Sequence, residues 1–277
     1  MTLTIPTINF ADGTPVPLVG LGTYCLQGNP GADAVAAALQ QGYRLLDTAA
    51  QYNNETAVGE GIRRSGVARD EVLITTKVAG GSHGRAATRT AVDESRRRLG
   101  VDTIDIVLIH WPNPSRGLTV ETWATLVQLK EEGVITHIGV SNFRPEQLTE
   151  LHDATGVWPA MNQIQLSPAL ARTEAVRFHA EHGIVTEAWG PLGTREGLLD
   201  QLVVHKIAGK HGVDPRQVVL KWIVDRGIVV IPKSKDPQRQ ASNATFNFEL
   251  DDDDRALLAT LDLGEEHAWD SREHEEW

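Results

Sequence analysis

The sequence predicts a (β/α)8 barrel, in which a closed sheet of eight parallel strands is surrounded by helices. Two observations lead to this fold class. Eight short, β-branched and nearly continuous apolar runs recur along the 277 residues, as expected of strands buried on both faces. Helical patterns lie between the runs without a low-complexity linker, which indicates one domain over residues 1–277. An open, doubly wound sheet is the alternative that the same alternation allows.

The apolar runs place the strands. A β-hairpin is expected before the barrel, because Thr7–Phe10 and Thr14–Val16 flank a turn at Ala11-Asp12-Gly13. The barrel strands are then predicted at Val19–Thr23, Tyr43–Asp47, Val72–Lys77, Ile104–His110, Ile135–Ser141, Met161–Ile164, Ile184–Ala188 and Ile228–Ile231. Each run has the length of an ordinary strand.

The intervening helices carry start and stop signals. Helical patterns cover Ala32–Gln40, Arg85–Leu99, Val120–Glu132 and Pro215–Asp225. Gly100 and Gly133 follow two of them, and glycine is the usual residue just after a helix. Asp214 is a possible N-cap of the last one, which has Pro at its first position.

The C-terminal part of the chain is rich in charge. Asp251–Asp254 should open a helix over Arg255–Leu261, because carboxylates are stabilised near the N-terminus of a helix. Gly264–Trp277 is charged and partly aromatic, and we expect a loop or tail there.

Composition excludes several classes of function. The chain has 26 basic and 37 acidic residues, a net charge of −11 that repels nucleic acid and anionic membranes. No apolar run approaches the roughly 18–20 residues of a membrane span, and MTLTIPTINF does not read as a signal peptide. Cys25 is the only cysteine, which fits a reducing compartment. We therefore expect a cytoplasmic protein with no nucleic-acid or membrane partner.

Polar side chains gather at the predicted C-terminal ends of the strands. In a barrel of this class, these ends converge on one face, where the active site lies. The residues concerned, in chain order, are Asp47 with Tyr52, Lys77, His110, Ser141 with Asn142, Gln163, Trp189, and Lys233 with Ser234. A buried Lys and Asp are costly unless they pair, so their joint placement on one rim indicates a function.

Four of these groups suit proton delivery to a carbonyl oxygen. A phenol such as Tyr52 is a poor acid at neutral pH, and a neighbouring ammonium such as Lys77 lowers its pKa. Asp47 would hold Lys77, and His110 would orient the carbonyl or relay a proton. No side chain supplies a hydride, so a nicotinamide cofactor is implied. A barrel aldolase or hydrolase with Lys77 as a Schiff-base nucleophile is the alternative.

Three segments form an ordered series of motifs. They are Gly42–Ala49 continued through Tyr52–Glu55 and Gly59, then Ile138–Phe143, then Ile231–Ser234 with Arg239 and Asn243. In this order they resemble the three signatures of the aldo-keto reductases. Asn162–Gln165 and Glu187–Gly193 are also similar to the family, and the resemblance runs from about Thr7 to about Leu263.

The resemblance implies an NADPH-dependent carbonyl reductase with a tetrad of catalytic residues. The tetrad maps onto Asp47, Tyr52, Lys77 and His110. It also implies that the nicotinamide carboxamide is held by Ser141, Asn142 and Gln163, and that the ring stacks on Trp189. Trp189 followed by Gly190 resembles the branch that contains the bacterial 2,5-diketo-gluconic acid reductases.

The remaining cofactor contacts are likewise implied by the resemblance. Gly190 and Leu192 would border the cofactor after Trp189. The adenosine 2′-phosphate would be bound by Lys233, Ser234 and Arg239, and the adenine by Asn243. Cationic and hydroxyl donors suit a phosphate dianion.

Some positions depart from the family's pattern. Thr136 stands where a charged residue is usual, and Ser242 stands where an acidic residue commonly precedes Asn243. Because Ser242 replaces that acidic residue, one contact to the adenine that the resemblance implies is affected. Gly20-Leu21-Gly22-Thr23 is too weak a match for the Gly-x-Gly-x-x-Gly fingerprint, so NADPH should bind extended across the barrel rim.

Residues after other strand ends should form the substrate pocket. Tyr24 and Trp111 are expected to line it together with His110, and Trp269 to close one side. The short segment Trp111–Leu118 favours small aldehydes, ketones or keto-sugars. We expect no metal site, since the helical pair His179 and His182 has no third ligand and is assigned to the surface.

Two functions remain as hypotheses from different classes. The first is a monomeric NADP(H)-dependent oxidoreductase that transfers hydride to a small-molecule carbonyl substrate, with Tyr52 as general acid. The second is a cofactor-binding regulatory subunit with little turnover. The complete set of four catalytic residue types favours the enzyme.

Overall fold

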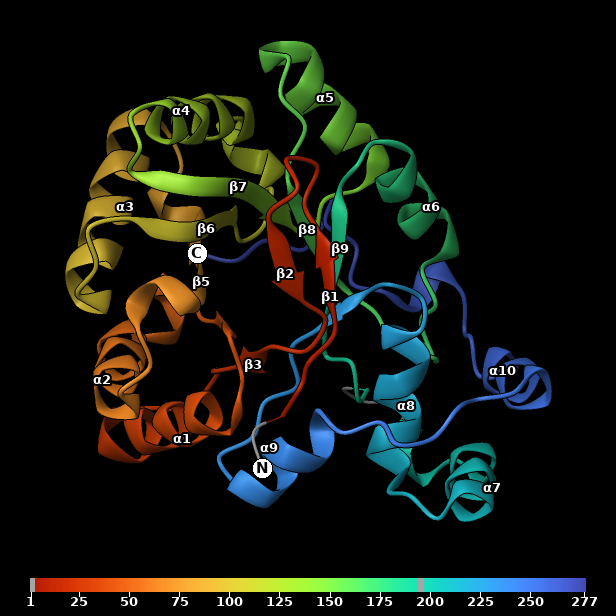
Figure 1. Cartoon of the computed structure of the whole chain (residues 1–277). Coiled ribbons are helices and arrows are strands. Elements are labelled where there is room, and N and C mark those ends of the chain that lie inside the picture. Colours follow the sequence, from red (N-terminus) through yellow and green to blue (C-terminus); the bar gives the residue numbers. More distant parts are fainter. Residues whose placement is uncertain (1–2, 194–196) are drawn as a thin grey trace.

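Eight parallel strands form the wall of a closed barrel in the computed structural model, which describes residues 3–193 and 197–277 (Figure 1). Their order is β10-β9-β8-β7-β6-β5-β4-β3. The first and last strands meet, because Gly20 N donates to Val230 O over 2.8 Å and Val230 N donates to Leu18 O over 2.9 Å. The predicted barrel is thus confirmed, and the open-sheet alternative is wrong.

Every predicted apolar run contains a strand. The barrel strands are β3 (Leu21–Gly22), β4 (Leu45–Asp47), β5 (Leu73–Val78), β6 (Ile104–Ile109), β7 (Ile135–Ser141), β8 (Met161–Gln165), β9 (Val185–Trp189) and β10 (Val229–Val230). The first and last are shorter than predicted, because the chain is paired there partly through isolated bridges of Val19 to Val230 and of Gly22 to Lys233. A Cβ on Gly22 would lie 2.5 Å from Ile231 O, so glycine permits this close approach.

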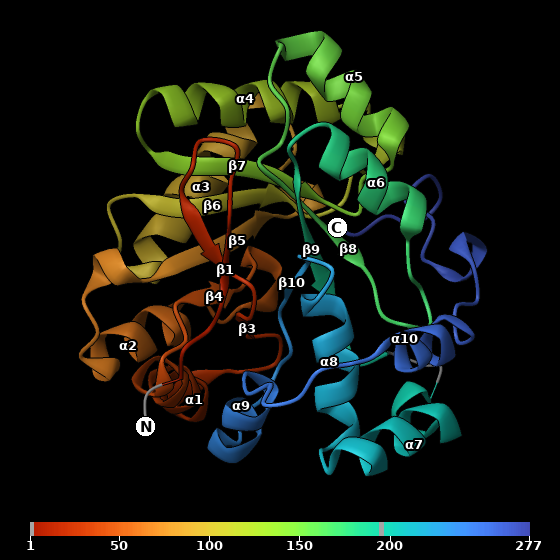
Figure 2. The same cartoon turned by 45° about the vertical axis from the view of Figure 1, so that its right-hand side comes forward.

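Helices surround the strands (Figures 1 and 2). They are α1 (Gly28–Gln41), α2 (Glu55–Ser65), α3 (Arg85–Leu99), α4 (Thr119–Glu131), α5 (Pro145–Thr155), α6 (Thr173–Glu181), α8 (Pro215–Val224) and α9 (Pro237–Asn243). Two more, α7 (Leu202–His211) and α10 (Asp252–Ala259), lie side by side outside this ring. Short 3-10 helices cover Ala50–Tyr52, Arg69–Glu71, Gly80–Ser82, Pro114–Arg116, Leu198–Asp200 and Glu265–His267. No helix within the described ranges has the length and apolar character needed to cross a bilayer.

Capping side chains mark the starts of α8 and α10, and two helices begin earlier than predicted, α1 at Gly28 and α10 at Asp252. Asp214 caps α8 by accepting a hydrogen bond from Arg216 N over 2.9 Å, as predicted. The last helix, α10, begins at Asp252 rather than at Arg255. Asp251 is its N-cap and accepts from Asp254 N over 2.9 Å. The acidic run therefore fills the first turn of the helix, where the aligned peptide dipoles stabilise carboxylates.

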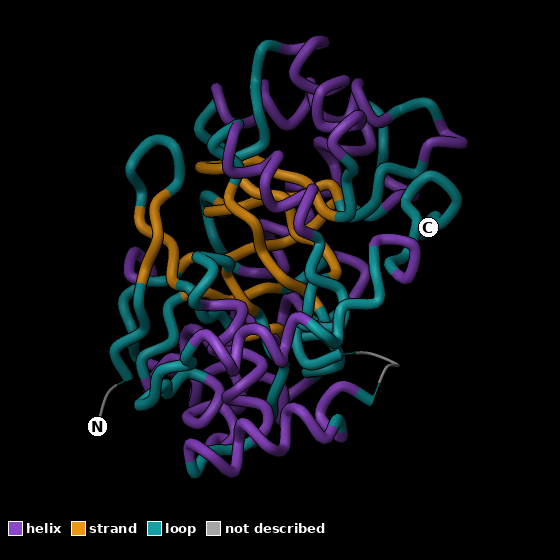
Figure 3. The backbone as a smooth tube through the Cα atoms, turned by 90° about the vertical axis from the view of Figure 1, so that its right-hand side faces the viewer, coloured by secondary structure: helices purple, strands orange, loops and turns teal. Residues whose placement is uncertain are grey.

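The N-terminal hairpin covers one end of the barrel. Its strands β1 (Thr7–Asn9) and β2 (Pro15–Pro17) are antiparallel. Phe10 stacks on the ring of His137 in β7 at 4.4 Å between centroids, and His137 Nε2 lies 3.0 Å from a carboxylate oxygen of Asp12. Figure 3 shows the hairpin and the C-terminus at opposite ends of the barrel. The hairpin thus leaves the C-terminal ends of the strands open to a ligand.

Helices α2 and α3 approach closely, and this contact gives a test of the packing. A Cβ on Gly59 would overlap the carbonyl oxygen of Leu99, whereas a Cβ on Gly209 in α7 would meet nothing within 4 Å. We expect Gly59→Ala to lower the free energy of unfolding by about 1–3 kcal/mol. Gly209→Ala should raise it by up to about 1 kcal/mol, because alanine favours helix. Denaturant titration measures both, and equal effects would contradict this packing.

Candidate active site

The C-terminal ends of the strands surround a cavity of about 730 Å³. Twelve of the predicted site residues line it: Tyr24, Asp47, Tyr52, His110, Trp111, Ser141, Asn142, Gln163, Trp189, Gly190, Leu192 and Lys233. Trp269 and Glu276, from the C-terminal segment, also line it. The segments that carry these residues are far apart in the sequence, and the parallel strands bring them to one rim.

A buried ion pair lies beneath the cavity. Lys77 Nζ donates to Asp47 Oδ1 over 2.7 Å and to Thr48 O over 3.0 Å. Burial alone would lower the pKa of Lys77, but the charge of Asp47 and the neighbouring Tyr52 raise it above its ordinary value. The Lys77 side chain has no exposed surface. A charged, enclosed amine does not suit a Schiff-base nucleophile, so the geometry does not favour the aldolase alternative.

Tyr52 lies between this ion pair and His110. Lys77 Nζ is 5.1 Å from the centroid of the Tyr52 ring, and the His110 ring meets it edge-on with centroids 5.7 Å apart. Burial raises the pKa of Tyr52, and the charge of Lys77 opposes this effect without cancelling it. The predicted lowering of the Tyr52 pKa by Lys77 is therefore outweighed by burial. The phenol therefore holds its proton at neutral pH, which is the form that a proton donor needs.

A hydrogen-bonded loop fixes the position of Tyr52. Asn54 accepts from Thr48 Oγ1 over 2.7 Å. Its Nδ2 donates to the carbonyl oxygens of Thr23 (2.7 Å) and Leu26 (3.1 Å). Asn54 thus ties the segment after β4 to the segment after β3. Asn54 was not predicted as a site residue, because two of its partners, Thr23 and Leu26, follow a different strand.

His110 is an uncharged member of the cavity wall. Burial first, and then the charge of Lys77, lower the pKa of His110 to about 3. Its Nδ1 is buried and has no partner, while its backbone carbonyl accepts from Asn142 Nδ2 over 3.2 Å. A neutral imidazole offers one donor and one acceptor, so it can orient a polar substrate atom.

Ser141, Asn142, Gln163 and Trp189 form a connected cradle. Ser141 Oγ donates to Gln163 O over 3.0 Å, Asn142 Nδ2 donates to Ser141 Oγ over 3.0 Å, and Trp189 Nε1 donates to Asn142 Oδ1 over 2.7 Å. Gln163 Nε2 donates to Asp47 Oδ1 over 2.8 Å. Since the side-chain donors are engaged, the cradle keeps oxygen lone pairs for a ligand, and these suit a carboxamide NH2 group.

Sequence reasoning missed Glu187, which lies in β9 below the cradle. Its Oε2 accepts from Gln163 Nε2 over 2.5 Å, and its Oε1 is buried without a partner. Burial first, and then the charge of Asp47, raise the pKa of Glu187 to about 8. A glutamate inside an otherwise apolar strand was the available signal. Its partners on β4 and β8 could not be foreseen from one strand.

The predicted phosphate and adenine residues lie around the end of β10. Lys233 is exposed and lines the cavity, and Arg239 is exposed on α9. Ser234 is outside the cavity wall, and its Oγ accepts from Asp236 N over 3.1 Å. Asn243 is buried and its Oδ1 has no partner.

Aromatic side chains also line the cavity. Tyr24 packs edge-on against Tyr52, with centroids 5.1 Å apart. Trp111 is buried and stacks on Trp269 at 6.1 Å. Trp269 therefore closes one side of the cavity, as expected, and Glu276 beside it was not anticipated.

The surface assignment of the histidine pair is wrong for His179. This residue is fully buried, with its ring nitrogens 3.0 Å from Asn162 Nδ2 and 2.9 Å from Thr186 Oγ1. His182 is half-buried and stacks on Phe178 at 4.2 Å. The pair is explained by packing and hydrogen bonding within the fold.

Comparison with known proteins identifies the family. The family model "Aldo/keto reductase family" matches residues 19–262. The chain belongs to the aldo/keto reductases. It is 46% identical over 273 residues to 2,5-diketo-D-gluconic acid reductase B of Corynebacterium sp. (strain SHS752001), with 98% of this chain and 99% of that protein covered.

Two further matches bear on the site. Methylglyoxal reductase DkgA of Escherichia coli (strain K12) is 41% identical, with 93% of this chain and 94% of that protein covered. A crystal structure of a Gox0644 variant in complex with NADPH has a TM-score of 0.92 and 39% identity, with 98% of this chain and 99% of that chain covered. The barrel fold is thus shared along nearly the whole length.

Glu187 gives this aldo/keto reductase a pH-dependent contribution to stability. Its pKa rises from 4.5 to about 8 on folding, so the native state binds the extra proton between these values. This contribution is complete below pH 4.5 and is lost as the pH rises through 8. We expect the unfolding free energy of wild type, relative to Glu187→Gln, to fall by on the order of a few kcal/mol between pH 5 and pH 9. Denaturant titration at each pH measures it, and parallel profiles would contradict the assignment.

Proposed function

We propose that this chain is an NADPH-dependent carbonyl reductase that acts on small aldehydes, ketones or keto-sugars, with Tyr52 as the general acid. One observation carries the proposal. The Tyr52 ring lies 5.1 Å from the ammonium of Lys77 and 5.7 Å from the ring of His110, on the wall of the cavity that also holds the cradle. Bound NADPH supplies the hydride that no side chain can provide.

Each member of the tetrad has a separate task. Tyr52 donates its proton to the carbonyl oxygen as negative charge develops there. Lys77 stabilises the phenolate that remains, and Asp47 keeps Lys77 charged and in place. His110, being neutral, donates a hydrogen bond that orients the carbonyl.

The residues near the cradle and β10 support NADPH as the cofactor. The oxygens of Ser141, Asn142 and Gln163 would accept from the nicotinamide carboxamide, and Trp189 would stack on the ring beside Gly190 and Leu192. Lys233, Ser234 and Arg239 would bind the 2′-phosphate, and Asn243 the adenine. NADPH in the related Gox0644 variant supports this choice. We further propose one barrel domain over residues 1–277 that works as a cytoplasmic monomer, with a small-molecule substrate as its partner.

Removal of the Tyr52 hydroxyl tests the proposal. Tyr52→Phe should reduce kcat with a small aldehyde by about 10²–10⁴-fold, because the general acid is lost. NADPH should still bind, as measured by quenching of tryptophan fluorescence. Tyr43→Phe is the matched control: Tyr43 does not line the cavity, and its hydroxyl donates to Gln240 O over 2.8 Å, so its loss should leave kcat near the wild-type value.

One outcome would contradict the role of Tyr52, and another would contradict the enzyme. Near-normal turnover in Tyr52→Phe would show that another group donates the proton. NADPH binding without turnover by the wild type on a panel of carbonyls would favour the regulatory subunit instead.

The pH dependence of the two reaction directions should differ. Carbonyl reduction needs the phenol of Tyr52, whose pKa is raised, and His110 stays neutral far below pH 7 because its pKa is about 3. We expect kcat/KM for reduction to stay level from about pH 6 to pH 9. Alcohol oxidation needs the phenolate, so its rate should rise with pH across this range. A reduction rate that halves below pH 7 would contradict the assignment of His110.

A further inference from the structure

We propose that Glu276 makes the substrate pocket select against carbonyl compounds that carry a carboxylate, in favour of neutral or amine-bearing ones. The inference deepens the proposed reductase function and rests on it. It concerns the C-terminal segment 264–277, which ends on the rim of the barrel among the loops that follow β5 and β6.

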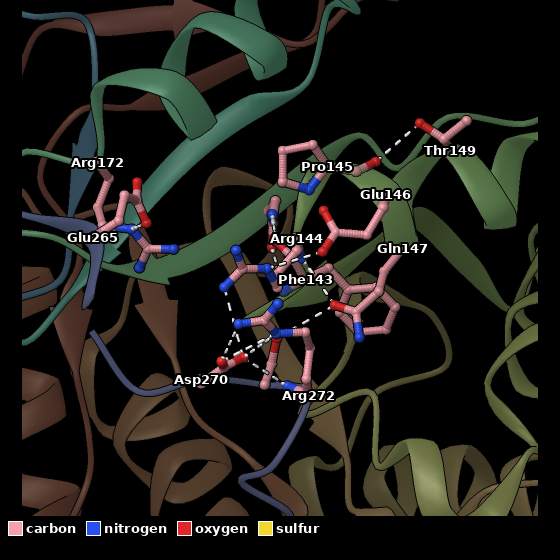
Figure 4. A network of polar contacts seen from close by, with 12 residues as sticks. Phe143, Arg144, Pro145, Glu146, Gln147, Thr149, Arg172, Glu265, Asp270 and Arg272 are labelled. Carbon is pink, nitrogen blue, oxygen red and sulfur yellow. Dashed lines mark hydrogen bonds and ion pairs between the residues drawn. The ribbon is translucent and has the colours of Figure 1, made fainter. Parts of the chain in front are cut away.

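Polar contacts hold this segment against the body of the barrel. Figure 4 shows the first set, in which Asp270 is paired with Arg272 and with Arg144 at the start of α5. The Arg144 contact measures 3.6 Å. Arg172 is joined to Glu265 over 2.8 Å in the same view. These contacts therefore anchor the segment on both sides of Trp269, which lines the cavity, and before Glu276.

The last residues are fixed by the loops that follow β5 and β6. Asn113 Nδ2 donates to Glu276 O over 2.5 Å, and Glu276 N donates to Asn113 Oδ1 over 3.3 Å. Glu275 accepts from the Ser115 hydroxyl over 2.6 Å. Gly80 lies under Glu276, and a Cβ there would overlap the Glu276 carbonyl oxygen. The backbone contacts set where the Glu276 side chain begins.

The Glu276 side chain belongs to the cavity wall on the substrate side. One of its carboxylate oxygens lies 3.4 Å from His274 Nε2. The His274 ring packs on Trp111 at 4.4 Å and on Trp269 at 4.5 Å. The negative charge of Glu276 also contributes to the raised pKa of Tyr52, which places it within electrostatic reach of the reacting carbonyl.

Two groups that can carry positive charge, His274 and Arg116, lie near Glu276, but neither lines the cavity. Lys233 is the only lysine or arginine among the described residues that line the cavity. It follows β10, which stands across the barrel from β6, and the proposed cofactor phosphate would engage it. Lys77 is neutralised by Asp47. A substrate carboxylate entering beside Trp111 would thus meet an acidic wall.

Two carboxylates in a partly buried cavity repel one another strongly, because water screens them poorly there. The entering carboxylate would also lose hydration without gaining a cationic partner. Neutral carbonyls avoid both costs, and an ammonium on the substrate would be attracted.

A pair of aromatic aldehydes tests the inference, since the tryptophans at the pocket suit a ring. The probes are 4-formylbenzoate and its methyl ester, assayed with NADPH on the full chain at pH 8. We expect wild type to favour the ester by at least about tenfold in kcat/KM, which corresponds to about 1.4 kcal/mol. Glu276→Gln should lower this ratio by about fivefold or more, and Glu276→Lys should lower it further. The intrinsic reactivities of the two aldehydes cancel when variants are compared.

Glu273→Gln is the matched control. It removes the same charge from the same exposed segment, but Glu273 does not line the cavity, so the ratio should match wild type. A ratio unchanged in both Glu276 variants, or changed equally by Glu273→Gln, would overturn the selection by Glu276 while leaving the reductase intact. No turnover of either aldehyde by wild type would overturn the proposed function and this inference together.

Discussion

The buried contact between Lys77 and Asp47 is the constraint on which the site depends. Neither side chain keeps appreciable contact with water, so each charge would destabilise the fold without the other. Thr48 O and Gln163 Nε2 satisfy further positions around the pair. The barrel supplies this arrangement because β4, β5 and β8 end on the same rim. The ammonium is thereby held under the Tyr52 ring, where it acts on the phenol.

The charge balance between Lys77 and Asp47 explains the protonation state of Glu187. Asp47 already neutralises Lys77, so a second ionised carboxylate nearby would be uncompensated. Glu187 therefore retains its proton, and Gln163 Nε2 bridges the two acids. The same bridge turns the amide of Gln163 so that its oxygen is the atom left for a ligand. The structural layer below the cavity and the ligand cradle above it are thus one hydrogen-bonded unit.

The fold was predictable because its signals are local and periodic. Buried parallel strands give short apolar runs, and polar residues at the ends of those runs identified the rim. The features that could not be predicted depend on contacts between distant segments. The net effect of burial on Tyr52, the partners of Glu187 and the arrival of Glu276 at the cavity each require the closed barrel. The early start of α10 is a different case. Each aspartate of the acidic run can serve either as the N-cap or as part of the first helical turn, and the sequence does not distinguish these roles.

Gly80 neither lines the cavity nor belongs to the tetrad, yet it determines how the C-terminal segment packs beside the substrate pocket. The C-terminal segment can lie on the rim only because this position has no side chain. Any larger residue there would lift the segment and remodel one wall of the pocket, while Tyr52, Lys77 and Asp47 stayed in place. Substitution at this one position during evolution would therefore change which molecules enter the pocket, while the reaction performed on them stayed the same.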